Sequence, residues 1–305
     1  ENVSWPPPQK WDTHNNVFFD EASQTYVVTT RSVPEEPTGL ERETSLTRSI
    51  GPKYAFDFSV APPVILRGNI SHQTYAQITF PWLNVYLGLV MVFDQDTGDQ
   101  VHCRLTVASR PEGPWHPVEG DNIIEAPDFL PFGEAKAFDS HVIFAAARPF
   151  RHGSGADAEE RVYYMGGDGP HDGERKSSFG LATLRPDGFA SVSGHGTFTT
   201  PSITVTDVLL TATIDFGPSS AGSGTLRIGV LPDDATDPPV ALSLKNSVPL
   251  TANATDATMH WVGGCGGPDL TYLIGKTVKL EVNLEGDAML YAIGFSRRAV
   301  EDATC

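Results

Sequence analysis

Acidic residues stand beside histidines at two matched positions in the sequence. Asp12 and His14 form an Asp-Thr-His triplet, and Asp139 and His141 form an Asp-Ser-His triplet. A carboxylate next to an imidazole is suited to general acid–base or nucleophilic chemistry once a proton donor lies within reach. We therefore assign Asp12 as the base or nucleophile and Asp139 as a second acid that orients or tunes it. The alternative for each aspartate is to cap a turn.

A polar loop at residues 168–177 is expected to supply the proton donor. It separates two short runs of β-branched and aromatic residues, which predict strands. Its titratable side chains are His171, Asp172, Glu174 and Arg175. Glu174 is the first choice for the donor, and Glu134 and Glu43 are the alternates. The competing interpretation is a solvated hairpin loop without a site, which is the commoner fate of such loops.

Short strands must position these residues. The chain has 29 Gly, 24 Pro and 10% aromatic residues, and apolar residues recur with period two rather than 3.6. Three units of about 55 to 65 residues begin near residues 11, 72 and 138, each with three or four strands, which is typical of propeller blades. We expect residues 12–20, 72–80 and 138–145 to be inner strands of separate sheets around one axis. Irregular hairpins in a sandwich are the alternative.

The pattern changes from about residue 193 onward. Evenly spaced short strands with alternating apolar residues predict an antiparallel β-sandwich with one buried face per sheet. The six expected strands are 208–216, 225–231, 240–244, 260–262, 277–284 and 288–295. The sequence thus predicts an all-β chain with two domains, propeller blades at 1–192 and a sandwich at 193–305.

Charge and hydropathy exclude several classes of partner. The net charge of −17 and the pI of about 4.8 argue against nucleic acid and anionic membrane surfaces. No apolar run approaches the roughly 20 residues of a membrane span. The chain begins with Glu1 and not with Met, so we expect a processed start.

Sequons and cysteines point to a secretory pathway. Asparagines in Asn-x-Ser/Thr triplets, candidates for glycosylation, are Asn2, Asn69 and Asn253. Cys265 and Cys305 could form a disulfide, whereas Cys103 lies in an apolar run and is expected to be a buried thiol. The cysteine spacing fits no zinc motif, and no metal or other cofactor is implied.

Several motifs together resemble a known family. They are WDTHNNVFFD at 11–20, YYMGGDGPH at 163–171, SSFGLATLRPDGF at 177–189 and LYAIGF at 290–295. With these motifs the chain resembles a group of glycoside hydrolases related to families 32 and 43, over roughly residues 10–296. In that group a five-bladed β-propeller precedes a β-sandwich. Pro111 and Glu112 replace the acid of the usual Ser-Arg-Asp-Gly turn.

The resemblance implies a fold that this chain carries incompletely. Only about three blades are visible, so the upstream blades of the family pattern are absent here. Unpaired sheet edges invite further strands. We therefore expect another chain, or a segment of the same precursor, to pack against residues 1–60 and complete the propeller.

The resemblance also implies a function on carbohydrate. It predicts a secreted glycoside hydrolase that cleaves a poly- or oligosaccharide through paired carboxylates, with retention or inversion left open. The alternative is a noncatalytic glycan-binding or extracellular structural protein in a larger assembly. The expected sugar-binding residues are His14, His72, His141 and His171 for hydroxyl groups, Tyr75, Trp82 and Trp115 for ring faces, and Arg42 and Arg175 for a carboxylate.

Overall fold

The computed structural model of this chain describes residues 14–33, 42–51, 56, 62–217, 224–233, 240–262 and 268–297. In these ranges the regular elements are β-strands and four short 3₁₀ turns, so the predicted all-β class is confirmed. The chain forms two compact units, described separately below. Unit 1 comprises residues 1–150 and 161–183, and unit 2 comprises residues 151–160 and 184–305. The domain boundary at residues 192 and 193 stays a prediction.

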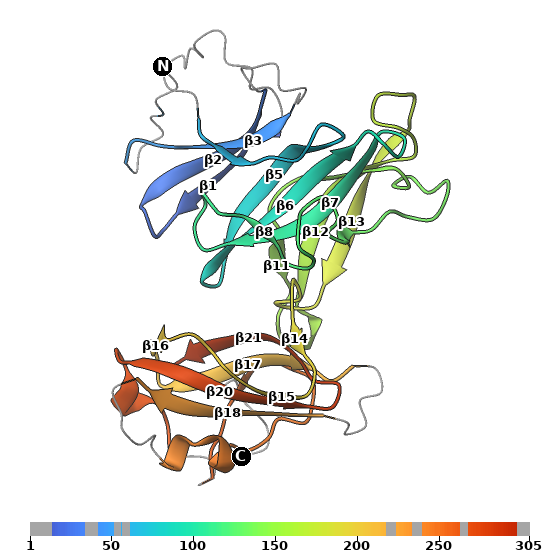
Figure 1. Cartoon of the computed structure of the whole chain (residues 1–305). Coiled ribbons are helices and arrows are strands. Elements are labelled where there is room, and N and C mark those ends of the chain that lie inside the picture. Colours follow the sequence, from blue (N-terminus) through green and yellow to red (C-terminus); the bar gives the residue numbers. More distant parts are fainter. Residues whose placement is uncertain are drawn as a thin grey trace. The chain divides into compact units, whose positions relative to one another are not determined.

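The first sheet of unit 1 has four antiparallel strands in sequence order (Figure 1). They are β1 (Asn16–Asp20), β2 (Thr25–Ser32), β3 (Glu43–Arg48) and β4 (Val64–Leu66). Phe18, Val27 and Leu46 form its buried core. The β1–β2 hairpin turns at residues 21–24, Glu-Ala-Ser-Gln, which join two runs rich in Val, Phe and Thr.

The second sheet lies mostly in unit 1, with residues 151–152, 159–160 and 184 of its strands belonging to unit 2, and it contains two groups of antiparallel strands. The first group is β5 (His72–Trp82), β6 (Val85–Asp94) and β7 (Gln100–Ala108), with β8 (His116–Pro117) and β9 (Asp128–Leu130) on β7. The second group is β10 (Val142–Ala145), β12 (Glu159–Gly167) and β13 (Ser177–Leu184), with β11 (Phe150–His152) on β12. β6 is almost wholly buried because its run of apolar residues lies between β5 and β7.

The expectation of three separate sheets is corrected by this arrangement. Strands β5 and β10 lie in one nine-stranded sheet, because β10 pairs with β7 in parallel. The junction is a single residue pair, Val142 with Val101, supported by a 3.1 Å hydrogen bond from the Val101 N–H to the His141 carbonyl. The two groups therefore remain propeller-like sets of consecutive hairpins that touch at one seam.

Unit 2 is the predicted β-sandwich. One sheet has the order β14 (Val192–Ser193), β21 (Met289–Ser296), β17 (Leu209–Asp215), β19 (Ala254–Thr258). The other contains β15 (Gly196–Thr199), β20 (Thr277–Glu285), β16 (Ile203–Thr204) and β18 (Thr225–Pro232). Alternate residues of both sheets, such as Ile214, Ile228 and Val282, are fully buried in one shared core.

Two predicted strands of the sandwich are wrong. Residues 240–246 form two 3₁₀ turns, η2 (Val240–Leu242) and η3 (Leu244–Asn246), instead of a strand. Residues 260–262 contribute only an isolated bridge between Trp261 and Ser247. Both segments use single large side chains to fill the core, since Leu242 is 0% exposed and the buried Trp261 donates its indole N–H to the Ile228 carbonyl at 3.1 Å.

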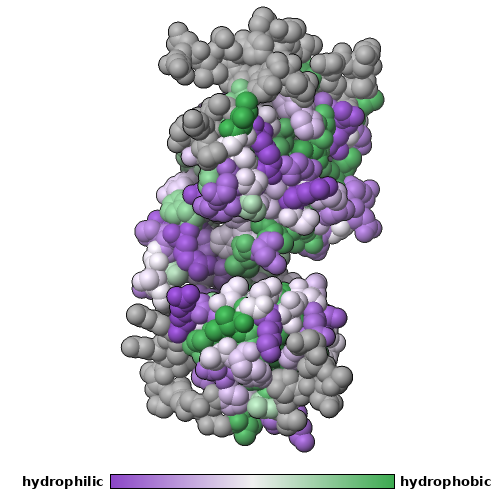
Figure 2. All heavy atoms as spheres, turned by 90° about the vertical axis from the view of Figure 1, so that its left-hand side faces the viewer, coloured by the Kyte–Doolittle hydropathy of each residue, from purple (hydrophilic) through white to green (hydrophobic). Residues whose placement is uncertain are grey.

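Surface and cysteine expectations can be compared with the described residues. Hydrophilic residues are interspersed with smaller hydrophobic areas on the face drawn in Figure 2. No helix in the described ranges is long and apolar enough to cross a membrane. Cys103 on β7 is a free, fully buried thiol, as predicted. Cys265 and Cys305 lie outside the described residues.

Candidate functional site

Imidazoles, guanidiniums and aromatic rings gather around one tyrosine of unit 1. We call this set the Tyr75 cluster; it consists of His14, Arg31, Arg42, Tyr75, Phe93, Phe144 and His171. Strands β5, β6 and β10 supply the three aromatic rings, and β2 supplies Arg31. His14, Arg42 and His171 lie just before β1, just before β3 and in the β12–β13 loop. Segments far apart in the sequence therefore meet here.

A β-bulge places the central ring. In the β5–β6 pair, Thr74 faces Val92 and Ala76 faces Met91, so Tyr75 is the extra residue between them. A bulge bends its strand and redirects the side chain of the extra residue. Tyr75 is consequently 8% exposed and contacts Phe144 with ring centroids 5.1 Å apart.

Both histidines of the cluster pack on aromatic rings. The His14 ring stacks on Phe144 at 4.7 Å and 15°, and its backbone has a left-handed φ of 55°. The His171 ring lies edge-on to Tyr75 at 5.0 Å and 90° and to Phe93 at 5.0 Å and 76°. These contacts fix both imidazole planes, which orients their ring nitrogens.

Two arginines cover the aromatic faces. The Arg31 guanidinium carbon lies 4.3 Å from the Tyr75 ring centroid, and that of Arg42 lies 4.8 Å from the Phe93 centroid. A guanidinium over a ring gains cation–π attraction while it keeps its full positive charge. Arg31 therefore covers one face of the Tyr75 ring.

The charges around His171 are mostly positive. Burial lowers the pKa of His171 below its ordinary value, and the nearby Asp172 carboxylate only partly opposes this. The guanidiniums of Arg175, Arg42 and Arg31 lower that pKa further. His171 is therefore neutral near pH 7. Among the described residues named here, three guanidiniums and one carboxylate act on the pKa of His171.

The β12–β13 loop is held in place by backbone contacts. The Arg175 guanidinium donates to the carbonyls of Pro170, at 3.2 Å, and His171. The His171 N–H donates to the Asp99 carbonyl at 2.8 Å. The Arg175 side chain therefore links the two ends of its own loop through hydrogen bonds to backbone carbonyls.

The sequence predicted four members of this cluster, namely His14, Arg42, Tyr75 and His171, and the structure brings them together. It missed Arg31, Phe93 and Phe144. A signal existed for Arg31, because a charged residue ends the otherwise uncharged β2 strand. Phe93 and Phe144 gave no such signal, since each lies in an apolar strand and is expected to be an ordinary core residue.

Asp139 lies in a tight backbone pocket formed by glycines. It is 8% exposed, and its Oδ2 accepts a 2.7 Å hydrogen bond from the Tyr164 hydroxyl. Burial, followed by this hydrogen bond, raises the pKa of Tyr164 to about 12. A Cβ on Gly166 would come within 2.5 Å of the Asp139 Cβ, so the carboxylate needs glycine there. The neighbouring His141 has its Nδ1 3.0 Å from the Ser140 hydroxyl.

The other predicted acids are not joined to Asp139 within the described residues. Glu174 and Glu134 are exposed, and Glu43 is buried in an ion pair with Arg67 at 2.6 Å. Asp12 lies outside the described residues. The catalytic roles of Asp12, Asp139 and Glu174 stay predictions.

His72 belongs to a different set of polar groups. The His72 Nε2 is 3.4 Å from Asp94 Oδ1. His102 lies between two carboxylates: its Nε2 is 3.8 Å from Asp94 Oδ2, and its Nδ1 is 2.9 Å from Asp128 Oδ2. Burial acts to raise the pKa of Asp94, but hydrogen bonds from Thr97 and backbone N–H groups outweigh it and hold that pKa below its ordinary value. In the described part of the chain, no group of three or more His, Cys, Asp or Glu side chains could hold a metal ion.

The remaining predicted residues are placed as follows. Trp115 is buried, and its indole N–H donates to the Pro111 carbonyl at 3.0 Å. Asn69 and Asn253 are exposed, and their amide oxygens accept backbone hydrogen bonds from His72 at 2.7 Å and Phe216 at 2.8 Å. Asn2 lies outside the described residues. Glycosylation at the three sites stays a prediction.

Known proteins provide a few distant likenesses. No family model and no curated protein matches the sequence. An N-acetylgalactosamine deacetylase from F. plautii in complex with blood group B trisaccharide matches with a TM-score of 0.40 and 15% identity, over 60% of this chain and 52% of that one. An exo-β-1,3-galactanase from Phanerochaete chrysosporium matches with a TM-score of 0.30 and 11% identity, over 93% and 68%. A fructofuranosidase from Schwanniomyces occidentalis matches with a TM-score of 0.30 and 8% identity, over 92% and 68%.

These structures include glycoside hydrolases, the class that the sequence motifs resemble. The chain spans about half the length of the deacetylase and about two thirds of the other two. Because the TM-scores are 0.40 or lower, these likenesses carry no inference about activity, which depends on the residues of the chain itself.

Proposed function

We propose that this chain is a secreted carbohydrate-binding protein whose Tyr75 cluster binds an acidic glycan without cleaving it. The observation that carries the proposal is the gathering of two guanidiniums and two imidazoles on the aromatic rings of the cluster. Guanidinium groups match the geometry of a carboxylate, and the planar fork favours two parallel hydrogen bonds. A sugar bearing a carboxylate fits this chemistry.

The choice of carbohydrate rests on the sequence motifs and on the two imidazoles. His171 is neutral near pH 7, since burial and three arginines lower its pKa. A neutral imidazole has one donor and one acceptor nitrogen, which suits sugar hydroxyl groups. The exposed sequons at Asn69 and Asn253 are in keeping with secretion.

A binding function is favoured over catalysis by the shortage of acids in the cluster. A glycosidase needs two carboxyl groups about 5 to 10 Å apart. Among the described residues that act on His171, Asp172 is the only carboxylate, and its side chain is 59% exposed. A catalytic acid needs burial or a like-charged neighbour to raise its pKa towards neutrality, and an exposed carboxylate on a loop lacks the burial.

Glycoside hydrolysis is the second candidate, and one observation favours it. His14 lies in the cluster, and Asp12 precedes it by two residues in the sequence. Asp139, buried against the Tyr164 hydroxyl, would then be the second acid. Under this alternative the cluster arginines would position an acidic substrate.

Calorimetry with matched ligands tests the binding proposal. Oligogalacturonate carries a carboxylate on every sugar, whereas its fully methyl-esterified form has the same frame without charge. We expect the full-length chain to bind the acid form at least about tenfold more tightly, a difference of about 1.4 kcal/mol. Arg42→Met and His171→Asn should weaken that binding by a similar factor, because each removes a group that faces the ligand.

Controls and the hydrolysis assay decide between the outcomes. Arg297→Met removes an arginine of unit 2 that is 85% exposed, and binding should not change. Equal binding of the two ligands, or no binding of either, would overturn the proposal. New reducing ends that disappear in Asp12→Asn and Asp139→Asn would replace it with the glycosidase.

A further inference from the structure

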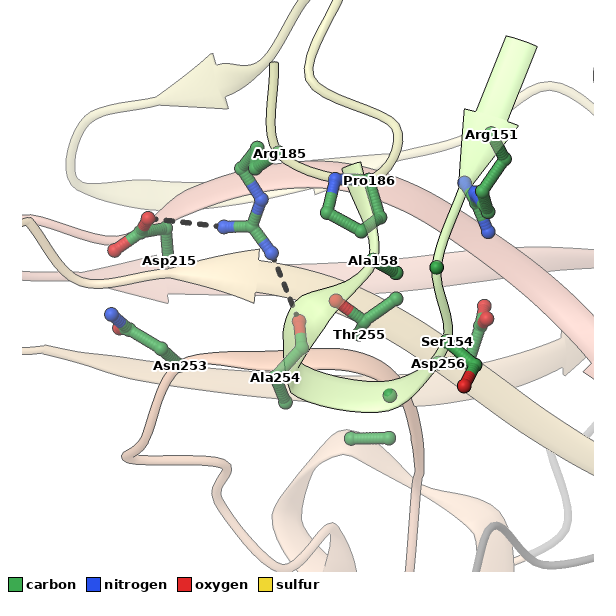
Figure 3. Close-up of a pocket in the computed structure, with 13 residues that line it drawn as sticks. Arg151, Ser154, Ala158, Arg185, Pro186, Asp215, Asn253, Ala254, Thr255 and Asp256 are labelled. Atoms are coloured by element: carbon green, nitrogen blue, oxygen red, sulfur yellow. Dashed lines mark hydrogen bonds and ion pairs between the residues drawn. The ribbon is translucent and has the colours of Figure 1, made fainter. Parts of the chain in front are cut away.

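Unit 2 contains a cavity of its own, about 770 Å³ in volume. We call it the unit 2 pocket. Four stretches line it: residues 151–158, the Arg185–Pro186 turn, Asp215 of β17, and residues 253–257 at the start of β19 (Figure 3). All of them fall within the residues of unit 2.

Arg151 is fixed at one side of the pocket. Its guanidinium donates to Glu160 at 2.7 Å and to Asp187 at 2.6 Å, and both carboxylates are buried. Asp187 in turn accepts a 2.9 Å hydrogen bond from the Thr213 hydroxyl. Two carboxylates on one guanidinium leave this side of the pocket with a net negative charge.

Arg185 is fixed in a second arrangement, visible in Figure 3. It pairs with Asp215 at 3.1 Å and donates to the Ala254 carbonyl at 3.1 Å. Its guanidinium carbon lies 4.4 Å from the Tyr291 ring centroid. Its charge is therefore already balanced by Asp215, and its planar group serves as a wall of the pocket.

Asp256 is the acid of the pocket without a balancing partner. In the described part of the chain, neither arginine forms an ion pair with it, and no hydrogen bond reaches its carboxylate. Burial, and then the neighbouring Asp187, raise the pKa of Asp256, and Arg151 only partly opposes them. It is the third residue of β19, exposed, with a left-handed φ of 54°, and it lines the pocket.

The balance of charge selects the ligand. The lining holds two guanidiniums, Arg151 and Arg185, and two carboxylates, Asp215 and Asp256. The buried Glu160 and Asp187, which pair with Arg151 from behind the lining, bring the set to four carboxylates against two guanidiniums. An anion is disfavoured there, and a cation gains most beside Asp256, where the negative charge is least compensated.

We propose that the unit 2 pocket binds an amino sugar, with its protonated amine beside Asp256. The hydroxyls of Ser154 and Thr255 line the same cavity and can bond to sugar hydroxyls. Ala158, Pro186 and Ala257 give an apolar surface for the ring. Gly155, with a φ of 58° and open space where a Cβ would lie, keeps the loop edge accessible. This binding is independent of the function proposed for unit 1.

Four sugars of one frame test the proposal by calorimetry on the full-length chain. Glucosamine carries the amine, N-acetylglucosamine has the same nitrogen without charge, glucose lacks it, and glucuronate has the opposite charge. We expect glucosamine to bind at least about tenfold more tightly than the neutral two, with no detectable binding of glucuronate. Equal affinity for glucosamine and glucose, tighter binding of glucuronate, or no binding at all would overturn the proposal.

Substitutions localise the site. Asp256→Asn keeps the size of the side chain and a residue that tolerates positive φ, so the fold should survive. We expect it to weaken glucosamine binding at least about tenfold. Asp233→Asn, an exposed position of unit 2 outside the lining, is the matched control and should change nothing. Arg42→Met in unit 1 should also leave glucosamine binding unchanged; unchanged binding in Asp256→Asn would overturn the assignment.

Discussion

Both units place an arginine over a tyrosine, and the groups that gather around the two rings differ. Arg31 lies 4.3 Å from the Tyr75 ring, and Arg185 lies 4.4 Å from the Tyr291 ring. In the Tyr75 cluster two more guanidiniums act on the same histidine. In the unit 2 pocket Arg185 also holds Asp215 at 3.1 Å. An aromatic ring supports a cation without cancelling its charge, whereas a carboxylate cancels it.

The difference decides what each place can recognise. The groups named around His171 are mostly guanidiniums and those named around Asp256 are mostly carboxylates, which is why we propose an acidic ligand for the first place and an amine for the second. The two places also respond to pH in opposite ways. The pKa of His171 is lowered and that of Asp256 is raised, and each shift favours the neutral form of its side chain.

Breaking the ion pairs of unit 2 should have the largest effect on stability. Arg151→Met leaves Glu160, which is 0% exposed, and Asp187 buried without their cation. We expect a loss of about 2 kcal/mol in the free energy of unfolding of unit 2, because two buried carboxylates lose the hydrogen bonds of a cation that is itself 38% exposed. Hydrogen exchange of the β17 and β20 amides measures it. A loss as small as that in Arg297→Met would show that the Arg151 pairs do not hold the sandwich.

The pH response of unit 1 should be intermediate in size. Burial lowers the pKa of His171 below 6.5, so the folded state resists protonation. The stabilising effect is present above pH 6.5 and is lost as the pH falls through the folded pKa. Histidine NMR signals should give a lowered pKa for His171, and Arg42→Met should raise it towards the ordinary value. A pKa that does not move in Arg42→Met would contradict the cationic description of the cluster.

The smallest effect is expected at Asp256. Its pKa is raised above 3.8, so its contribution to stability is fully present below pH 3.8 and is lost as the pH rises through the folded pKa. Asp256→Asn removes this cost at neutral pH and should increase the free energy of unfolding slightly, by no more than about 0.5 kcal/mol. Urea denaturation at pH 7 and at pH 3 checks the sign, because the gain should vanish at the lower pH.

Much of the fold could be predicted from local patterns. The alternation in residues 277–284 and the apolar run in residues 85–93 correspond to β20 and β6. The strands predicted at residues 240–244 and 260–262 were wrong, because a 3₁₀ turn or an isolated bridge can bury a Leu or Trp side chain as well as a strand can. Periodicity reports that a side chain is buried, and tertiary packing decides the backbone that carries it.

The site was predictable only in part for a similar reason. His14, Tyr75 and His171 were identified by residue type, and they do converge. The bulge that aims Tyr75 left no signature, because Thr-Tyr-Ala is an ordinary strand sequence. The unit 2 pocket was missed because its charges come from four separate stretches, and none of them forms a motif alone.

The seam between Val101 and Val142 has a consequence for how the chain is made. Residues 72–130 and 142–184 each pair almost wholly within themselves, through hairpins of neighbouring strands. Contacts that are local in sequence form fast, because little chain entropy is lost in closing short loops. The first group can therefore be complete before β10 has emerged from the ribosome. The nine-stranded sheet then closes by the meeting of two finished pieces at one residue pair, in the order in which translation delivers them.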